Sequence, residues 1–168
     1  MPRINHQVRL AARPNGLPRG TDWSLTDEEV PAPGPGQFTV AVSHISVDPA
    51  MRGWMNAVAS YVPPVEIGAV MRAGAIGTVT ASEHPGFAVG DEVYGVFGVQ
   101  EHAVSDGQGV IKIDTSLAAP SVYLGALGMT GLTAYFGLLD TGKLKAGDTV
   151  VVSGAAGAVG SIAGQIAK

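Results

Sequence analysis

A glycine-containing turn near the carboxyl end is the part of the sequence whose residue types and spacing most clearly indicate chemistry. The segment Ala155-Ala-Gly157-Ala-Val-Gly160 has the spacing of a dinucleotide-binding turn, with Ala155 at the position of the first glycine. Glycine at position 157 allows the backbone to approach a diphosphate, and Gly160 allows the following helix to pack closely. Backbone amides at the start of that helix would then face the negative charge.

The elements around this turn have the order that such a site requires. The apolar run Thr149-Val-Val-Val-Ser153 predicts a strand buried on both faces. Ile162 and Ile166 lie four residues apart, which predicts a following helix with one apolar side. This context favours a nucleotide-binding turn, and the alternative is a structural strand–helix turn without a ligand. The residue that would choose between NAD and NADP is expected about 20 residues further on, beyond Lys168.

Other catalytic and metal-binding patterns are missing from the sequence. It has no cysteine, which excludes disulfides, thiolate nucleophiles and cysteine-ligated zinc. It has no Gly-x-Ser-x-Gly elbow, and no tyrosine is followed four residues later by lysine, so a serine hydrolase and a short-chain dehydrogenase are disfavoured. The histidines lack metal-ligand spacing, and we predict no metal site. These histidines are His6, His44, His84 and His102.

Composition narrows the class of protein further. The 168 residues allow one ordinary domain, or one domain and part of another. Hydrophobic residues make up 46% and charged residues 14%, which excludes a disordered chain. The net charge of −4 argues against a nucleic-acid partner. The sequence begins without a signal peptide and contains no apolar run of about 18 residues, so we expect a cytoplasmic chain with no membrane span.

Most of the chain has the pattern of short strands separated by glycine and proline turns. These features predict a mainly β fold, a small and partly open β-barrel. Asp48-Pro49 begins a single helical turn, and residues 57–66 form a loop. After Asp114 the apolar spacing becomes helical, over Ser121–Leu127 and Met129–Leu139. The predicted strands lie at Phe38–Ser43, Gly74–Ala81, Val89–Phe97, Glu101–Ser105 and Val110–Asp114.

Three segments together resemble the zinc-free branch of the medium-chain dehydrogenase/reductase superfamily, the NADPH-dependent alkenal and enone reductases. This branch includes prostaglandin, curcumin and plant double-bond reductases, whose chains are about twice as long, so we expect a C-terminal truncation. The family usually carries Gly-Trp-x-x-Tyr where this chain has Gly98-Val99-Gln-Glu-His102, which alters a strand facing the cleft. The three segments are Asp48-Pro-Ala-Met-Arg52, Leu127-Gly-Met-Thr-Gly-Leu-Thr-Ala-Tyr-Phe-Gly-Leu-Leu139 and Val151-Val-Ser-Gly-Ala-Ala-Gly-Ala-Val-Gly-Ser161.

The resemblance implies a GroES-like β-barrel substrate domain over residues 1–120. Connecting helices and the first βα unit of a Rossmann cofactor domain would follow over residues 121–168. It also implies zinc-independent hydride transfer from NADP(H) to the β-carbon of an α,β-unsaturated aldehyde or ketone, although the sequence itself does not exclude NAD. The implied diphosphate contacts are Gly157, Ala158, Val159 and Gly160, the implied nicotinamide wall is Met129 and Thr133, and the implied substrate wall is Met51, Arg52 and Tyr61.

Each implied role has a simpler alternative. Met129 and Thr133 would serve equally as helix-packing residues, Met51 as a core residue and Tyr61 as an exposed loop residue. Because one turn lacks most of the crevice around a dinucleotide, we expect the chain alone to be nearly inactive. A quinone oxidoreductase is the alternative enzyme. The alternative that is not an enzyme is a β-barrel interaction module. An unpaired strand at Val150–Val152, with the helix after it, would promote a homo-oligomer.

Overall fold

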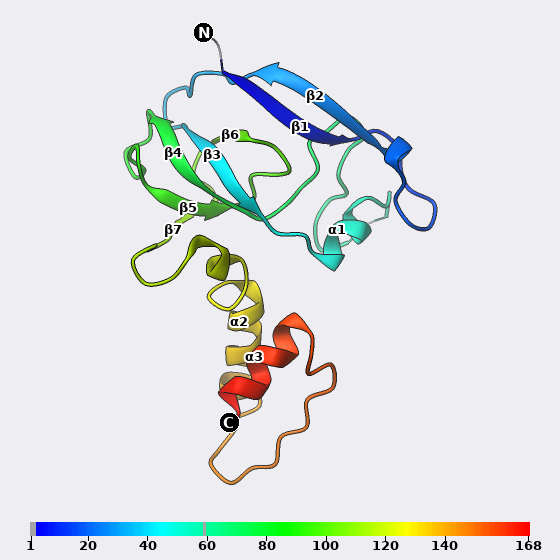
Figure 1. The fold of residues 1–168 in the computed structure, drawn as a ribbon, viewed down its shortest axis with the longest axis vertical. Coiled ribbons are helices and arrows are strands. Elements are labelled where there is room, and N and C mark those ends of the chain that lie inside the picture. Colours follow the sequence, from blue (N-terminus) through cyan, green and yellow to red (C-terminus); the bar gives the residue numbers. More distant parts are fainter. Residues whose placement is uncertain (1–2, 59) are drawn as a thin grey trace. The chain divides into compact units, whose positions relative to one another are not determined.

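The computed structural model describes residues 3–58 and 60–168. The chain forms two compact units that separate between Asp114 and Thr115. Among the described residues, the strands lie in the first unit and the second unit is helical (Figure 1). The mainly β fold class is therefore confirmed, whereas the domain boundary after residue 120 remains a prediction. Within the described residues, no helix is both long and apolar enough to cross a membrane.

A five-stranded antiparallel sheet forms the centre of the first unit, in the order β6-β3-β4-β5-β7. Its inward side chains form a buried cluster that includes Phe38, Val40 and Val79. Gly77 of β4 leaves no room for a side chain next to β3, because an added Cβ would be 2.8 Å from the Ala41 carbonyl carbon. The sequence predicted all five strands. Their bounds are Phe38–Ile45 (β3), Ala75–Ser82 (β4), Glu92–Gly95 (β5), His102–Ser105 (β6) and Ile111–Lys112 (β7).

An N-terminal hairpin, which the sequence analysis did not predict, forms a second antiparallel sheet (Figure 1). It consists of β1 (Ile4–Leu10) and β2 (Trp23–Glu29), with the short helix η1 (Gly20–Asp22) between them. The Val8 amide donates to the Val99 carbonyl and the Val8 carbonyl accepts from the Met71 amide, which connects β1 to the segments around the main sheet. The hairpin thereby becomes one wall of the barrel.

A one-turn helix, α1 (Pro49–Trp54), follows β3 as predicted. Asp48 precedes it in an extended conformation, and its carbonyl accepts a hydrogen bond from the Met51 amide at 3.0 Å. Residues 55–58 and 60–66 contain no regular element, which agrees with the predicted loop; residue 59 lies outside the described residues. Two of these loop residues, Met55 and Val65, form a second buried cluster with Leu10 and Met71.

The second unit is a small helical assembly. The helices α2 and α3 lie against each other (Figure 1). Gly131 makes a tight turn possible before α2, because an added Cβ would lie 2.6 Å from the Ala126 carbonyl carbon. The elements are η2 (Pro120–Leu124), α2 (Met129–Tyr135), the π-helical η3 (Phe136–Thr141) and α3 (Ala158–Ile166).

The strand predicted at Thr149–Ser153 is wrong: these residues have no regular structure. A strand is stabilised by hydrogen bonds to a neighbouring strand. The described residues of the second unit contain no strand that could be that neighbour. Val151 at the centre of the run is 90% exposed. Of the predicted βα unit, the helix forms and the strand does not.

Candidate functional site

The helix α1 presents Met51 to an apolar cavity of about 570 Å³ in the first unit. The Met51 sulfur accepts a hydrogen bond from the Asp48 amide at 3.4 Å, which holds the side chain back against its own turn. Met51 also packs against the second buried cluster. It is therefore both a packing residue and part of a cavity wall. The cavity is lined by Val8, Gly20, Trp23, Leu25, Ile45, Val47, Met51, Met71 and Val99.

Arg52, the next residue, is bonded to a neighbouring loop. Its guanidinium donates hydrogen bonds to the carbonyl of Gly16 at 2.8 and 3.0 Å and to that of Pro14 at 3.2 Å. It also donates to the Asn56 side chain at 2.7 Å. These contacts give Arg52 a structural role in holding the loop between β1 and β2, and contact with substrate remains a prediction.

Tyr61 lies in the loop after α1 and is 79% exposed. Its hydroxyl accepts a hydrogen bond from the indole of Trp54 at 3.4 Å. The Arg72 guanidinium lies over the same indole, 5.4 Å from its centre, and donates to the Pro63 carbonyl at 2.8 Å. The Tyr61 side chain is largely exposed, and its contact with substrate remains a prediction.

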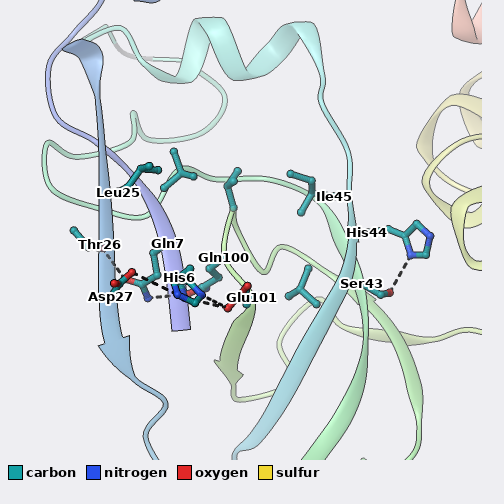
Figure 2. Close-up of a pocket in the computed structure, with 13 residues that line it drawn as sticks. His6, Gln7, Leu25, Thr26, Asp27, Ser43, His44, Ile45, Gln100 and Glu101 are labelled. Atoms are coloured by element: carbon teal, nitrogen blue, oxygen red, sulfur yellow. Dashed lines mark hydrogen bonds and ion pairs between the residues drawn. The ribbon is translucent and has the colours of Figure 1, made fainter. Parts of the chain in front are cut away.

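A second cavity of about 380 Å³ lies next to the first, with Val8, Leu25, Ile45 and Val99 in both walls. Its polar end contains His6, whose Nδ1 lies 2.5 Å from Glu101 and whose Nε2 lies 3.9 Å from Asp27. Figure 2 shows these three side chains gathered together. None of them stands out in the sequence as a site residue, because they come from three separate segments of the chain.

The contact between His6 and Glu101 shifts the pKa of both side chains. The hydrogen bond and then the charge of Glu101 raise the pKa of His6 above its ordinary value. The same hydrogen bond lowers the pKa of Glu101. Asp27 adds a smaller upward effect on the pKa of His6. The polar end therefore combines two carboxylates with one imidazole, and it is an acceptor-rich surface.

Ser43 and His44 also line this cavity, but the His44 ring does not point toward its polar end. The Ser43 hydroxyl lies 2.9 Å from His44 Nδ1. Figure 2 shows the His44 ring pointing away from the group formed by His6 and Glu101. Among the described residues, no group of three or more His, Cys, Asp or Glu side chains is placed to hold a metal ion.

The glycine turn lies in the second unit, at the start of α3. Gly157 is the residue before the helix, and its amide donates to the Gly154 carbonyl at 2.9 Å. Gly154 has a φ of +74°, which favours glycine. At Gly160 an added Cβ would lie 2.8 Å from the Gly154 carbonyl carbon and 3.1 Å from the Ala155 Cα. The turn is therefore folded tightly onto the first turn of the helix.

The first amides of α3, at Ala158, Val159 and Gly160, have no earlier carbonyl of their own helix to bind. They form a helix N-terminus of the kind that binds a phosphate. Met129 begins α2 and is 73% exposed, while the Thr133 hydroxyl donates to the Met129 carbonyl at 2.7 Å. The Thr133 hydroxyl is thus used within its own helix.

Comparison with known proteins identifies the family. Residues 6–113 match the family model described as the N-terminal domain of oxidoreductase. The chain belongs to this oxidoreductase family. Among its relatives, the YfmJ protein of Bacillus subtilis (strain 168) is 49% identical over the whole chain and 49% of its own length. The NADPH-dependent curcumin reductase of Escherichia coli (strain K12) is 44% identical over 98% of this chain and 48% of its own length.

Comparison with solved structures agrees with this family. CurA from Vibrio vulnificus is 46% identical, with a TM-score of 0.87 over 97% of this chain and 48% of that one. The structure of CurA in complex with NADPH is 44% identical, with a TM-score of 0.87 over 96% of this chain and 48% of that one. The resemblance to the enone-reductase branch of the medium-chain superfamily, with its GroES-like N-terminal domain, is confirmed. The chain spans about half the length of the curated relatives it matches.

Proposed function

We propose that this oxidoreductase reduces the C=C bond of α,β-unsaturated aldehydes or ketones with NADPH and without zinc. The observation that carries the proposal is the likeness to CurA in its NADPH complex, with a TM-score of 0.87 over 96% of this chain. The curcumin reductase of Escherichia coli, 44% identical, supports a small unsaturated carbonyl compound as substrate.

The residues of the glycine turn fit a dinucleotide. Gly160 leaves no room for a side chain beside the Gly154 carbonyl, so the turn and the helix start stay close together. We propose that Gly157, Ala158, Val159 and Gly160 contact the diphosphate, with the amides of Ala158, Val159 and Gly160 as the donors, since a helix start favours negative charge there. Met129, exposed at the start of α2, and Thr133, one turn further along, are proposed to contact the nicotinamide side.

When bound, NADPH supplies a hydride to the β-carbon of the substrate, and a proton then reaches the α-carbon. The residues of this chain are proposed to hold and orient the substrate and the cofactor for that transfer. Met51 offers an apolar surface, and Tyr61 offers an exposed hydroxyl as a hydrogen-bond donor. Arg52 is proposed to fix the loop beside α1, with a direct contact to substrate as the alternative. The chain has no cysteine with which to build the usual catalytic zinc site of the superfamily.

The test measures NADPH oxidation at 340 nm with an enone, the matching saturated ketone and a quinone, using the full-length gene product. We expect turnover of the enone, none of the saturated ketone, and no loss of rate in the presence of a zinc chelator. Preference for the quinone would support quinone oxidoreductase activity instead, and inhibition by the chelator would contradict the zinc-free mechanism. Because the 168-residue chain spans half the length of its relatives, we expect it to bind NADPH weakly and to show little turnover.

A second proposal concerns self-association of the chain rather than catalysis. The unpaired strand first expected to promote it does not form, but the second unit exposes apolar side chains at Met129, Leu132 and Val151. Exposed apolar surface of this kind promotes pairing of copies. Light scattering after size exclusion is expected to show more than one chain per particle, and a monomer at all concentrations would contradict it.

A further inference from the structure

The two cavities of the first unit form one groove with a gradient of polarity, which we name the hairpin groove. The register of β1 and β2 pairs Leu10 with Trp23, Val8 with Leu25 and His6 with Asp27. Side chains at alternate positions of a strand share one face. One face of the hairpin therefore changes along its length from apolar to ionisable.

The opposite wall of the hairpin groove repeats this order. Val47 and Met51 lie at the apolar end, Ile45 and Val99 line both cavities, and Glu101 lies at the polar end. In Figure 2, Leu25 and Ile45 lie to one side of the grouped polar side chains. The groove is thus apolar on both walls at one end and ionisable on both walls at the other.

The apolar part of the hairpin groove is open to a ligand. Leu25 is 81% exposed and Val47 is 82% exposed, although both line the cavity. Large apolar side chains gathered in one exposed groove mark a binding surface for apolar molecules. The contact of such a molecule with Leu25 and Val47 would remove their apolar surface from water.

The polar end determines which group of the ligand is recognised. The neighbouring amides are already used: Gln100 accepts hydrogen bonds from Asn5 and Gln7 and donates to the Phe97 carbonyl at 2.6 Å. Two carboxylates remain, those of Asp27 and Glu101, around the single imidazole of His6. At least one negative charge is left over, so this end favours a group that donates a hydrogen bond.

We propose that the hairpin groove binds an apolar molecule that carries a hydroxyl donor at one end, such as an alkylphenol. The apolar body lies along Trp23, Leu25 and Val47, and the hydroxyl donates to Asp27 or Glu101. Its apolar end includes Met51, which is also part of the proposed substrate wall. The proposal goes beyond the reductase function because the polar end, at Asp27 and Glu101, lies outside that proposed wall and binding requires no cofactor.

The test uses the 168-residue chain, with 4-butylphenol and its methyl ether as probes and NMR chemical shifts as the readout. We expect the phenol to shift the indole signal of Trp23 and the amides of Leu25 and Ile45. The ether, which lacks the donor, should bind about fivefold more weakly, the effect of one net hydrogen bond. Shifts confined to other residues, or equal affinity for both probes, would overturn the proposal.

Paired variants separate the two ends of the groove. Leu25→Ser should lower the affinity for both probes about fivefold, because apolar contact is lost. The control Leu17→Ser, at an 86% exposed position outside the groove, should leave both affinities unchanged. Asp27→Asn combined with Glu101→Gln should reduce the preference for the phenol, because the neutral amide oxygens are weaker acceptors than carboxylates. No change in either experiment would refute the site. Because neither probe needs NADPH, a separate NADPH titration shows whether the reductase proposal fails or stands on its own.

Discussion

Replacing Gly160 with alanine tests the geometry of the proposed dinucleotide turn. The added Cβ would lie 2.8 Å from the Gly154 carbonyl carbon and 3.1 Å from the Ala155 Cα, so backbone must move. Overpacking of this kind costs about 2 kcal/mol. Replacing glycine with alanine within a helix stabilises the folded state by about 1 kcal/mol. The net expectation for Gly160→Ala is a loss of about 1 kcal/mol of unfolding free energy.

Gly164 in the same helix is the matched control. An added Cβ there meets nothing within 4 Å, so Gly164→Ala should gain about 1 kcal/mol from helix propensity alone. The two variants should therefore differ by about 2 kcal/mol, roughly a 30-fold change in the unfolding equilibrium. Urea unfolding followed by the helical circular dichroism signal at 222 nm measures the difference. If Gly160→Ala were as stable as Gly164→Ala, the close approach of the turn to α3 would be refuted.

The remaining predictions concern the first unit. The His6–Glu101 pair should stabilise the fold most between the ordinary pKa values of about 4.5 and 6.5; this stabilisation is lost as the pH falls through the lowered pKa of Glu101 and as it rises through the raised pKa of His6. An NMR titration should show the pKa of His6 falling in Glu101→Gln. Gly77→Ala should lower stability by about 1–3 kcal/mol in a thermal melt, while Gly53→Ala, with open space around its Cβ, should not. Arg52→Ala should speed amide exchange in the loop it holds, and an unchanged rate would contradict that role.

The main sheet was predictable because apolar and polar residue types alternate along β3. Phe38 and Val40 are fully buried, as that alternation predicted, although Thr39 between them is buried as well. The hairpin was missed because part of its inward face is polar: Asn5 and Gln7 are buried, which obscures the pattern in β1. In β2 the alternation from Trp23 to Asp27 was the signal that could have identified a strand.

The candidate site was predictable only where its residues are consecutive. The glycine turn is local in sequence, and its spacing at Gly157 and Gly160 identified it directly. The hairpin groove joins His6, Asp27 and Glu101 through the register of strands, which no local spacing encodes. The failed strand at residues 149–153 has the same cause, since a strand depends on partners that local sequence does not specify.

Asn5 shows how much of the assembly depends on the chemical identity of one amide. Its Nδ2 donates to the Gln100 side chain at 3.0 Å and to the His102 carbonyl at 2.8 Å, while its Oδ1 accepts from the amides of Glu101 and His102. Deamidation to aspartate would replace the donor with a charged oxygen that faces two other oxygens. Chemical ageing at this single position would therefore loosen the hairpin from the sheet without any change in the encoded sequence.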